Sequence, residues 1–270
     1  MAHSERIIGL AQWLATPAGR YLLAWEQHHL DLAVADLFGF HALHVGLPEL
    51  DALRANRMPH RWVGCESVEP PPSEGEPMPR AAVALNLDFD ALPFDSASLD
   101  LVVLPHTLEM ARDPHQTLRE VERVLVPEGR VVIVGFNPAS LWGLRQGLGR
   151  ARLGLGLGRQ RPLFLPATGE FLGYRRLRDW LRLLSFEVES GRFGCYRPPV
   201  SSERWLQRYE WMDGSGERWW PVFGAAYFVV AVKRVRGMRL VGLVRDQRQR
   251  VKAAATVATH KRREREKEPA

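Results

Sequence analysis

The pattern of hydrophobic and polar positions is clearest between residues 92 and 138, where it predicts a strand, a helix and a second strand. Leu99 to Pro105 is a short apolar run, typical of a strand that is buried on both faces. Asp113 and Pro114 then supply an N-cap and a first-turn proline to a helix whose apolar residues recur at helical spacing. A turn at residues 127–129 leads into a β-branched run at residues 131–134. Two such strands joined through a helix lie parallel in one sheet, so the pattern predicts an α/β domain.

Weaker patterns flank this unit on both sides. Helices are predicted over residues 4–38, with a stop-and-start signal at Thr16 and Pro17, and over residues 177–184. The further predicted strands are residues 40–46, 61–66, 81–87, 186–190 and 227–232. These elements extend the α/β domain along most of the chain.

Two segments have unusual compositions. Residues 141–161 interleave glycine and arginine with leucine, which predicts a mobile basic loop or a frayed helix over a site. Residues 198–221 form an insert with four tryptophans, Trp205, Trp211, Trp219 and Trp220. So many indoles in a short stretch predict either a hydrophobic cap over an acceptor pocket or a small satellite core.

Length and composition narrow the class of protein. A chain of 270 residues with 46% hydrophobic residues holds one main domain with a substantial core. The sequence has no run of eighteen uncharged apolar residues and no secretory-type start, so a cytoplasmic protein without a transmembrane segment is expected. Cys65 and Cys195 are too few and too far apart for a disulfide framework or a metal site, and no metal is expected.

The formal charge of +6 is unevenly distributed. Residues 233–270 hold thirteen Lys or Arg against four Asp or Glu, so this tail carries +9 and the rest of the chain is mildly acidic. A basic tail suits nucleic acid, an anionic membrane surface or an acidic partner, and a solvated tail that only improves solubility is the alternative. The tail is expected to be disordered, or to form a helix on binding.

The motifs of the central unit resemble a known family. The order LPF, S-x-D-x-V-V, a loop with His and Glu, E-x-x-R-V-L-x-P-x-G-R and a strand ending in FNP is similar to class I S-adenosylmethionine-dependent methyltransferases, in particular the small-molecule branch with the ubiquinone and menaquinone biosynthesis enzymes. The resemblance implies a Rossmann-like, seven-stranded, mostly parallel sheet with helices on both faces, in which the last strand runs antiparallel between the fifth and sixth. It divides the chain into an N-terminal helical segment 1–39, a methyltransferase-like domain 40–232 and the basic tail.

The resemblance also implies which residues bind S-adenosylmethionine. Gly46 takes the place of the first glycine of the family's D/E-x-G-x-G-x-G loop, and Glu66 takes the place of the acidic residue that binds the ribose hydroxyls. Asp88 matches the aspartate that accepts a hydrogen bond from the adenine amino group, and Phe89 would offer a backbone donor and a ring face. The ordinary alternatives are a loop carboxylate for Glu66 and a turn cap for Asp88.

The glycine loop itself departs from the family pattern. His44 replaces the usual acidic residue, Pro48 the second glycine and Leu50 the third. Glycines there let the backbone approach the cofactor, and proline also removes a donor. This change motivates a second hypothesis, a non-catalytic scaffold with the methyltransferase fold whose basic tail binds nucleic acid or a protein partner.

His106 and Glu109 follow the fourth predicted strand at its carboxyl end, where open α/β sheets bind their ligands. His106 is the candidate catalytic residue, because the unperturbed pKa of histidine suits a general base, and it is also a candidate cofactor contact. A loop histidine bonded to backbone is the alternative. The sequence thus predicts methyl transfer from S-adenosylmethionine to an unidentified small-molecule acceptor, with oxygen, nitrogen and carbon all open as the methylated atom.

Overall fold

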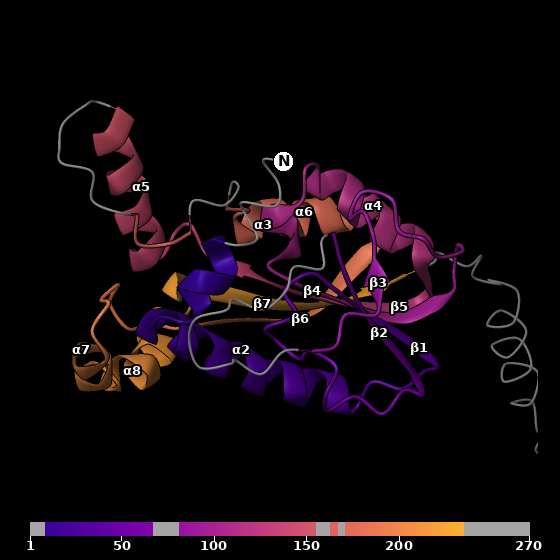
Figure 1. Cartoon of the computed structure of the whole chain (residues 1–270), viewed down its shortest axis with the longest axis horizontal. Coiled ribbons are helices and arrows are strands. Elements are labelled where there is room, and N and C mark those ends of the chain that lie inside the picture. Colours follow the sequence, from indigo (N-terminus) through magenta and orange to yellow (C-terminus); the bar gives the residue numbers. More distant parts are fainter. Residues whose placement is uncertain (1–8, 67–80, 155–162, 167–170, 235–270) are drawn as a thin grey trace, which may run out of the picture. The chain divides into compact units, whose positions relative to one another are not determined.

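The computed structural model describes residues 9–66, 81–154, 163–166 and 171–234 (Figure 1). The chain divides into one compact unit up to Val235 and a second unit over residues 236–270. The predicted disordered or helical tail therefore lies outside the described residues, apart from Lys233 and Arg234. Lys233 belongs to the last strand and is buried, so this strand ends one residue beyond the predicted residue 232.

One seven-stranded sheet forms the centre of the main unit, with the strand order β3-β2-β1-β4-β5-β7-β6. The strands are β1 His41–Val45, β2 His60–Cys65, β3 Leu85–Asn86, β4 Leu99–Pro105, β5 Leu125–Phe136, β6 Phe186–Gly194 and β7 Ala226–Lys233. The strands from β1 to β5 pair in parallel, and β7 lies antiparallel between β5 and β6. The predicted Rossmann-like topology, with the last strand antiparallel, is confirmed.

Helices cover both faces of this sheet. Figure 1 shows α2 on one face and α4 and α6 on the other. The helices are α2 Pro17–Ala35, α3 Thr107–Met110, α4 Pro114–Val124, α5 Leu141–Gly154, α6 Tyr174–Leu183, α7 Glu203–Arg208 and α8 Trp211–Trp219, and the 3-10 helix η1 is Pro221–Phe223. Among the described helices, none combines the length and the apolar character that a bilayer span needs.

Two caps set the helix starts where the sequence predicts them. The Thr16 side chain accepts a hydrogen bond from the Gly19 backbone at the start of α2, so the predicted helix over residues 4–38 is interrupted there, and residues 9–14 form a separate helical turn. The Asp113 carboxylate accepts hydrogen bonds from the backbone of the first turn of α4. In each case a proline occupies the first helical position, where its missing N–H has no cost.

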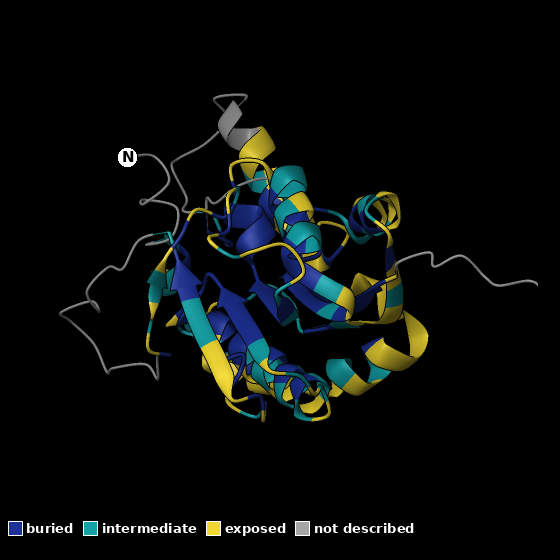
Figure 2. Ribbon diagram, turned by 90° about the vertical axis from the view of Figure 1, so that its right-hand side faces the viewer, coloured by how far each residue is buried: buried dark blue, intermediate teal, exposed yellow. Residues whose placement is uncertain are grey.

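The central strands form the core, which Figure 2 shows as buried ribbons between partly exposed helices. Every residue of β7 is buried, as is every residue of β4 except Asp100. The Asp100 carboxylate accepts hydrogen bonds from the backbone N–H groups of Phe40 and His41, at 2.8 and 2.9 Å. This pair of bonds ties the start of β1 to β4.

Three elements have different bounds in the structure from those that the sequence predicts. The strand expected over residues 81–87 pairs only at Leu85 and Asn86, because it lies at the edge of the sheet and contacts β2 alone. Residues 126–129 are skipped in the pairing of β4 with β5, so the predicted turn lies inside a continuous strand. Strand β6 runs to Gly194, beyond the predicted end at residue 190.

The segment 141–161 is helical as far as Gly154, and residues 155–161 lie outside the described part of the chain. Two buried side chains anchor this helix, α5. The indole of Trp142 donates to the Arg197 carbonyl at 2.8 Å, and the Gln146 amide donates to the Leu165 carbonyl at 3.1 Å. These contacts make the described part of the predicted loop an ordered helix.

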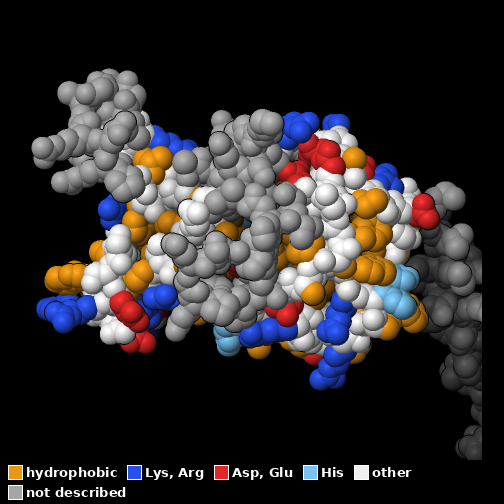
Figure 3. All heavy atoms as spheres, viewed as in Figure 1, with side chains coloured by type: hydrophobic (Ala, Val, Ile, Leu, Met, Phe, Trp, Pro, Cys, Tyr) orange, Lys and Arg blue, Asp and Glu red, His pale blue; other side chains and the backbone are white. Residues whose placement is uncertain are grey.

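The tryptophan-rich insert folds as α7, α8 and η1. Its indoles face solvent, with Trp205, Trp211, Trp219 and Trp220 exposed by 47, 62, 73 and 38%. Figure 3 shows hydrophobic and basic side chains next to each other at the end of the molecule where α7 and α8 lie. The prediction of a small satellite core is wrong, because exposed indoles do not pack into one.

Gly194 gives a direct test of how α2 packs on the sheet. A Cβ at this position would lie 2.0 Å from the Trp25 indole of α2, so Gly194→Ala should lower the free energy of unfolding by about 1–3 kcal/mol through overpacking. Gly147→Ala is the matched control, because it has no atom within 4 Å and should raise helix stability by up to about 1 kcal/mol. Chemical denaturation of both variants checks the pair, and equal effects would contradict this packing.

Candidate functional site

The strand order reverses between β1 and β4, which lie side by side while their chains continue in opposite directions across the sheet. Open α/β sheets bind ligands at the carboxyl ends of the strands at such a point. Each of the predicted site residues follows the carboxyl end of a strand: Gly46 after β1, Glu66 after β2, Asp88 and Phe89 after β3, and His106 after β4. The structure therefore brings all five to one edge of the sheet.

Gly46 has a backbone conformation that requires glycine. Its φ of +84° lies in the left-handed region, and its N–H donates to the Gly64 carbonyl at 2.7 Å. A Cβ here would lie 3.1 Å from Thr107 Oγ1 and 3.3 Å from Met110 Cε. The backbone of β1 therefore ends in a bend that no larger residue can adopt without strain.

The loop after Gly46 is filled by its own side chains. Leu47 and Leu50 are buried, and the Pro48 carbonyl accepts a hydrogen bond from Ala81 N at 2.8 Å. Residues 46–59 form turns instead of a helix before β2 begins. His44, at the position where an acidic residue is usual in the family, is fully buried, and this burial lowers its pKa to about 3. The ring is neutral at physiological pH.

Glu66 lies half-exposed at the end of β2, next to the segment that follows β3. Burial raises the pKa of Glu66 to about 7, in spite of a hydrogen bond from the Phe89 backbone, and the charges of Asp88 and Asp90 raise it further. The carboxyl group therefore titrates near neutrality. Its role as the ribose ligand, which the resemblance implies, stays a prediction.

Asp88 and Phe89 lie together but face different ways. The exposed Asp88 carboxylate accepts a hydrogen bond from Asp90 N at 2.9 Å, which is the turn cap that the sequence left as its alternative. Phe89 is fully buried, and its ring lies 3.6 Å from the place where a Gly46 Cβ would be. Of the two, Phe89 makes the closer approach to the bend at Gly46.

His106 is held between two carboxylates in a completely buried position. Its Nδ1 lies 2.7 Å from Glu109 Oε2, and its Nε2 lies 2.8 Å from Glu26 Oε1 of α2. Both ring nitrogens face carboxylate oxygens, an arrangement in which an imidazolium donates two hydrogen bonds. Burial alone would lower the pKa of His106, but Glu26 and Glu109 outweigh it and raise this pKa to about 10. A ring nitrogen that already holds a proton cannot accept one, so the general-base prediction for His106 is not supported.

The backbone and aromatic rings around His106 fix its place. Its backbone has a left-handed φ of 54°, and its N–H donates to the Val134 carbonyl at 2.9 Å. The alternative of a ring bonded to backbone is wrong, because the ring bonds to carboxylates. Glu109 also accepts a hydrogen bond from the Phe136 backbone, and the Phe136 ring lies 4.4 Å from the imidazole between ring centres.

Sequence analysis missed Glu26, the residue that completes this cluster. The signal was present, because Glu26 lies between Leu22 and Leu30 on the buried stripe of α2, where a charged side chain is unexpected. It also missed Thr107, which donates to the Val45 carbonyl and so joins the ends of β1 and β4.

A second polar cluster joins α2 to the insert. Asp213 of α8 accepts hydrogen bonds from the Tyr21 hydroxyl of α2, from Arg197 Nε at 2.8 Å and from the Tyr196 backbone. The Arg197 guanidinium also lies 4.4 Å above the centre of the Tyr21 ring. The Arg197 guanidinium pairs with the Asp213 carboxylate and also lies 3.8 Å from the exposed carboxylate of Glu210.

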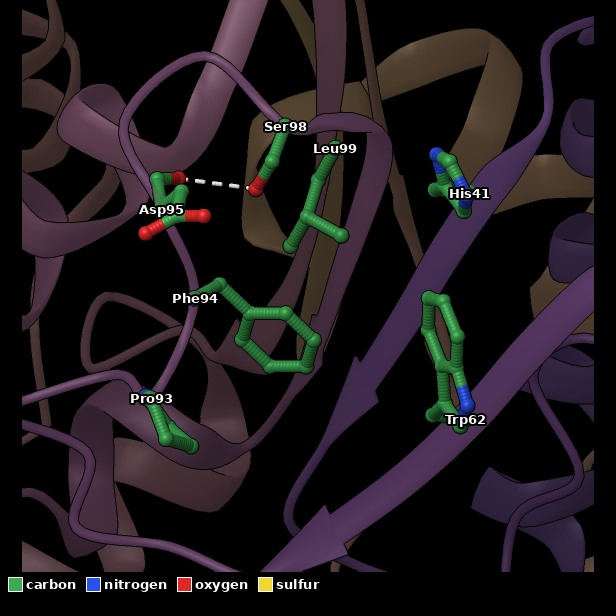
Figure 4. A pocket seen from close by; sticks show the side chains of 7 residues that line it. All are labelled: His41, Trp62, Pro93, Phe94, Asp95, Ser98 and Leu99. Atoms are coloured by element: carbon green, nitrogen blue, oxygen red, sulfur yellow. Dashed lines mark hydrogen bonds between the residues drawn. The ribbon is translucent and has the colours of Figure 1, made fainter.

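A separate hollow lies at the opposite edge of the sheet. It has a volume of about 260 Å³ and is lined by the rings of His41, Trp62 and Phe94 (Figure 4). His41 begins β1 and Leu99, also in the lining, begins β4, so this hollow is at the amino ends of the strands. It is thus distinct from the edge with Gly46. In the described part of the chain, no three His, Cys, Asp or Glu residues are grouped closely enough to hold a metal ion.

Comparisons of sequence find similarity to methyltransferases over part of the chain. A family model described as a methyltransferase domain matches residues 72–133. The Escherichia coli (strain K12) protein YafS is 30% identical over 176 residues, which is 65% of this chain and 65% of YafS. A malonyl-[acyl-carrier protein] O-methyltransferase of Halorhodospira halophila is 41% identical over 58 residues, 22% of this chain and 20% of that protein. The chain therefore spans less than two thirds of the length of these relatives.

Comparisons of structure agree on the fold. A chain from the complex of the Haloferax volcanii Trm112 methyltransferase activator with a methyltransferase aligns with a TM-score of 0.52 and 18% identity, over 84% of this chain and 97% of that one. A SAM-dependent methyltransferase of Thermotoga maritima aligns with a TM-score of 0.51 and 16% identity, over 79% of this chain and 92% of that one. At such identities the likeness establishes the fold alone.

The charge state of His106 predicts how stability depends on pH. The folded pKa of about 10 lies above the ordinary value of 6.5, so the stabilisation is complete below pH 6.5 and is lost as pH rises towards 10. His106→Gln should lower the free energy of unfolding at pH 6 by about 3–5 kcal/mol, because it leaves two buried carboxylates without a cation. The difference from the unsubstituted protein should shrink as the pH approaches 10. Urea denaturation at several pH values measures this trend, and an NMR titration of the imidazole with a midpoint near 6.5 would contradict it.

Proposed function

We propose that this chain is a class I S-adenosylmethionine-dependent methyltransferase that transfers a methyl group from that donor to a small-molecule acceptor. When bound, S-adenosylmethionine supplies a methyl group activated on a positively charged sulfur. The observation that carries the proposal is the bend at Gly46, with a φ of +84° at the point where the strand order reverses. A strained glycine at this point serves close approach of a ligand to the backbone.

The residues at the edge fit the nucleoside half of the cofactor. In this proposal the Glu66 carboxyl group accepts hydrogen bonds from the ribose hydroxyls, and the pKa of about 7 makes ribose binding stronger above neutrality. The buried ring of Phe89 packs beside the bend at Gly46, and Asp88 accepts from the adenine amino group through the oxygen that does not cap the turn. These three residues follow β2 and β3, beside Gly46, as a continuous nucleoside site requires.

In this proposal His106 positions α2 and α3 and does not transfer a proton. Because this imidazole is held as a cation between two carboxylates, it orients α2 and α3 instead of taking a proton from the acceptor. The acceptor must therefore present an atom that is already nucleophilic, and holding that atom against the methyl group supplies the catalysis. The small-molecule acceptor is suggested by similarity to a demethylmenaquinone methyltransferase of Chlamydia pneumoniae, which is 33% identical over 54 residues.

The non-catalytic scaffold remains the second candidate. The observation in its favour is the loop after Gly46, where buried Leu47 and Leu50 fill the space beside the backbone and no helix forms across residues 46–59. In this alternative the fold carries a basic tail to nucleic acid or a protein partner. The two candidates differ in one measurable property, which is the affinity for the methyl donor.

Titration calorimetry with S-adenosylhomocysteine tests the proposal. The unsubstituted protein should bind this product, and Gly46→Ala should weaken binding at least about tenfold, or roughly 1.4 kcal/mol, because alanine disfavours a positive φ and meets Thr107. Gly214→Ala is the control, since its Cβ has no atom within 4 Å and should leave the affinity unchanged. If millimolar ligand does not bind to the unsubstituted protein, the enzyme proposal is wrong and the scaffold is favoured.

A further inference from the structure

The buried cluster at the functional edge has an unbalanced charge. It contains one imidazolium, His106, and two carboxylates, Glu26 and Glu109, all of them 3% exposed or less. The nearby pair of Asp213 and Arg197 is already neutral by itself. The cluster therefore keeps one negative charge inside the protein, where an uncompensated charge is unfavourable.

The surplus charge is located on Glu26. Both oxygens of Glu109 are used, one by His106 and one by the Phe136 backbone. Glu26 gives Oε1 to His106, whereas its Oε2 is buried and makes no hydrogen bond to the part of the chain that the structure describes. A neighbouring thiol, Cys195, does not balance it, because burial first and the charge of Glu26 second raise the pKa of that thiol.

This carboxylate is linked through His106 and Thr107 to the bend that the proposed function assigns to the methyl donor. Thr107, the residue after His106, joins the end of β4 to Val45 and lies 3.1 Å from the position of a Gly46 Cβ. At the same edge β1 lacks an acidic residue, because the corresponding position is occupied by His44, which burial keeps neutral. The end of β1 thus offers a neutral histidine, and the carboxylate comes from α2.

We propose that Glu26 is the counter-charge for a cationic group of the bound methyl donor, either its sulfonium or its amino-acid ammonium. The inference rests on the proposed function, because it needs the donor to bind at the Gly46 edge. The free Oε2 of Glu26 then gains a cation, and the buried cluster becomes neutral in the complex. Glu26 acts as a binding residue that recognises the charged end of the donor, and Glu66 recognises the ribose.

Three ligands that share adenosine but differ in charge test this assignment. S-adenosylmethionine has both cationic groups, S-adenosylhomocysteine has the ammonium alone, and 5′-methylthioadenosine has neither. Glu26→Gln should weaken S-adenosylmethionine binding roughly 10- to 100-fold, as expected for one charge-assisted contact, and should leave 5′-methylthioadenosine unchanged. If Glu26→Gln weakens the binding of S-adenosylmethionine alone, the paired group is the sulfonium. If it weakens the binding of both S-adenosylmethionine and S-adenosylhomocysteine, the paired group is the ammonium. Equal losses of affinity for all three ligands, or no loss for any of them, would overturn the proposal.

Glu66→Gln is the matched control, because it removes a carboxylate from the same edge. It should weaken all three ligands alike, since each has the same ribose hydroxyls. If the unsubstituted protein binds none of the three ligands, the proposed function fails, whereas normal binding with no ligand-dependent effect of Glu26→Gln defeats only the assignment of Glu26.

Thermal unfolding without ligand gives a second, independent readout. Glu26→Gln removes the surplus charge but keeps an oxygen that can accept the hydrogen bond from His106 Nε2. The ligand-free variant should therefore unfold at the same or a higher temperature, while the upward shift caused by S-adenosylmethionine becomes smaller. A purely structural ion pair predicts the reverse, a lower unfolding temperature without ligand and an unchanged ligand-induced shift, and this result would reject the counter-charge role.

Discussion

The imidazolium of His106 joins the elements that build the functional edge. Through Glu26 it fixes α2, the helix that covers one face of the sheet, and through Glu109 it fixes α3 and the end of β5. The ring can do this only while it is protonated, because a neutral imidazole cannot donate to two carboxylates. Order at the edge therefore depends on one buried proton, and the same proton prevents His106 from acting as a base.

The charged cluster of Glu26, His106 and Glu109 contrasts with the neutral end of β1, where the loop is altered. The loop has replaced glycines with Pro48 and Leu50 and an acidic residue with His44, which leaves the end of β1 apolar and neutral. The cluster on the other side of Gly46 is negative and has an unused carboxylate oxygen. In our interpretation α2, rather than β1, supplies the negative charge that a cationic donor needs. The bend at Gly46 still allows the backbone to contact the donor.

The sequence predicted the fold well because its strongest signals are local. Helical spacing and the Asp113 cap placed α4, and the β-branched runs placed β4 and β5. Gly46, Glu66, Asp88 and Phe89 followed from the resemblance to a family, and His106 from its position at a strand end. The partner of His106 could not be found in this way, because Glu26 lies 80 residues earlier and looks like one position of a helix stripe. The exposed indoles of the insert also escaped prediction, since a hydrophobic pattern alone does not say whether a face meets protein or solvent.

A crystal structure of the protein grown with S-adenosylmethionine tests the central claim most directly, namely that the donor binds at Gly46 and neutralises Glu26. We expect the adenosine to lie beside Gly46, Glu66 and Phe89, and a cationic group of the donor to lie within about 4 Å of the Glu26 carboxylate, the limit of an ion pair. Ligand bound in the hollow between His41 and Trp62, or a donor whose cationic groups both lie away from Glu26, would contradict it.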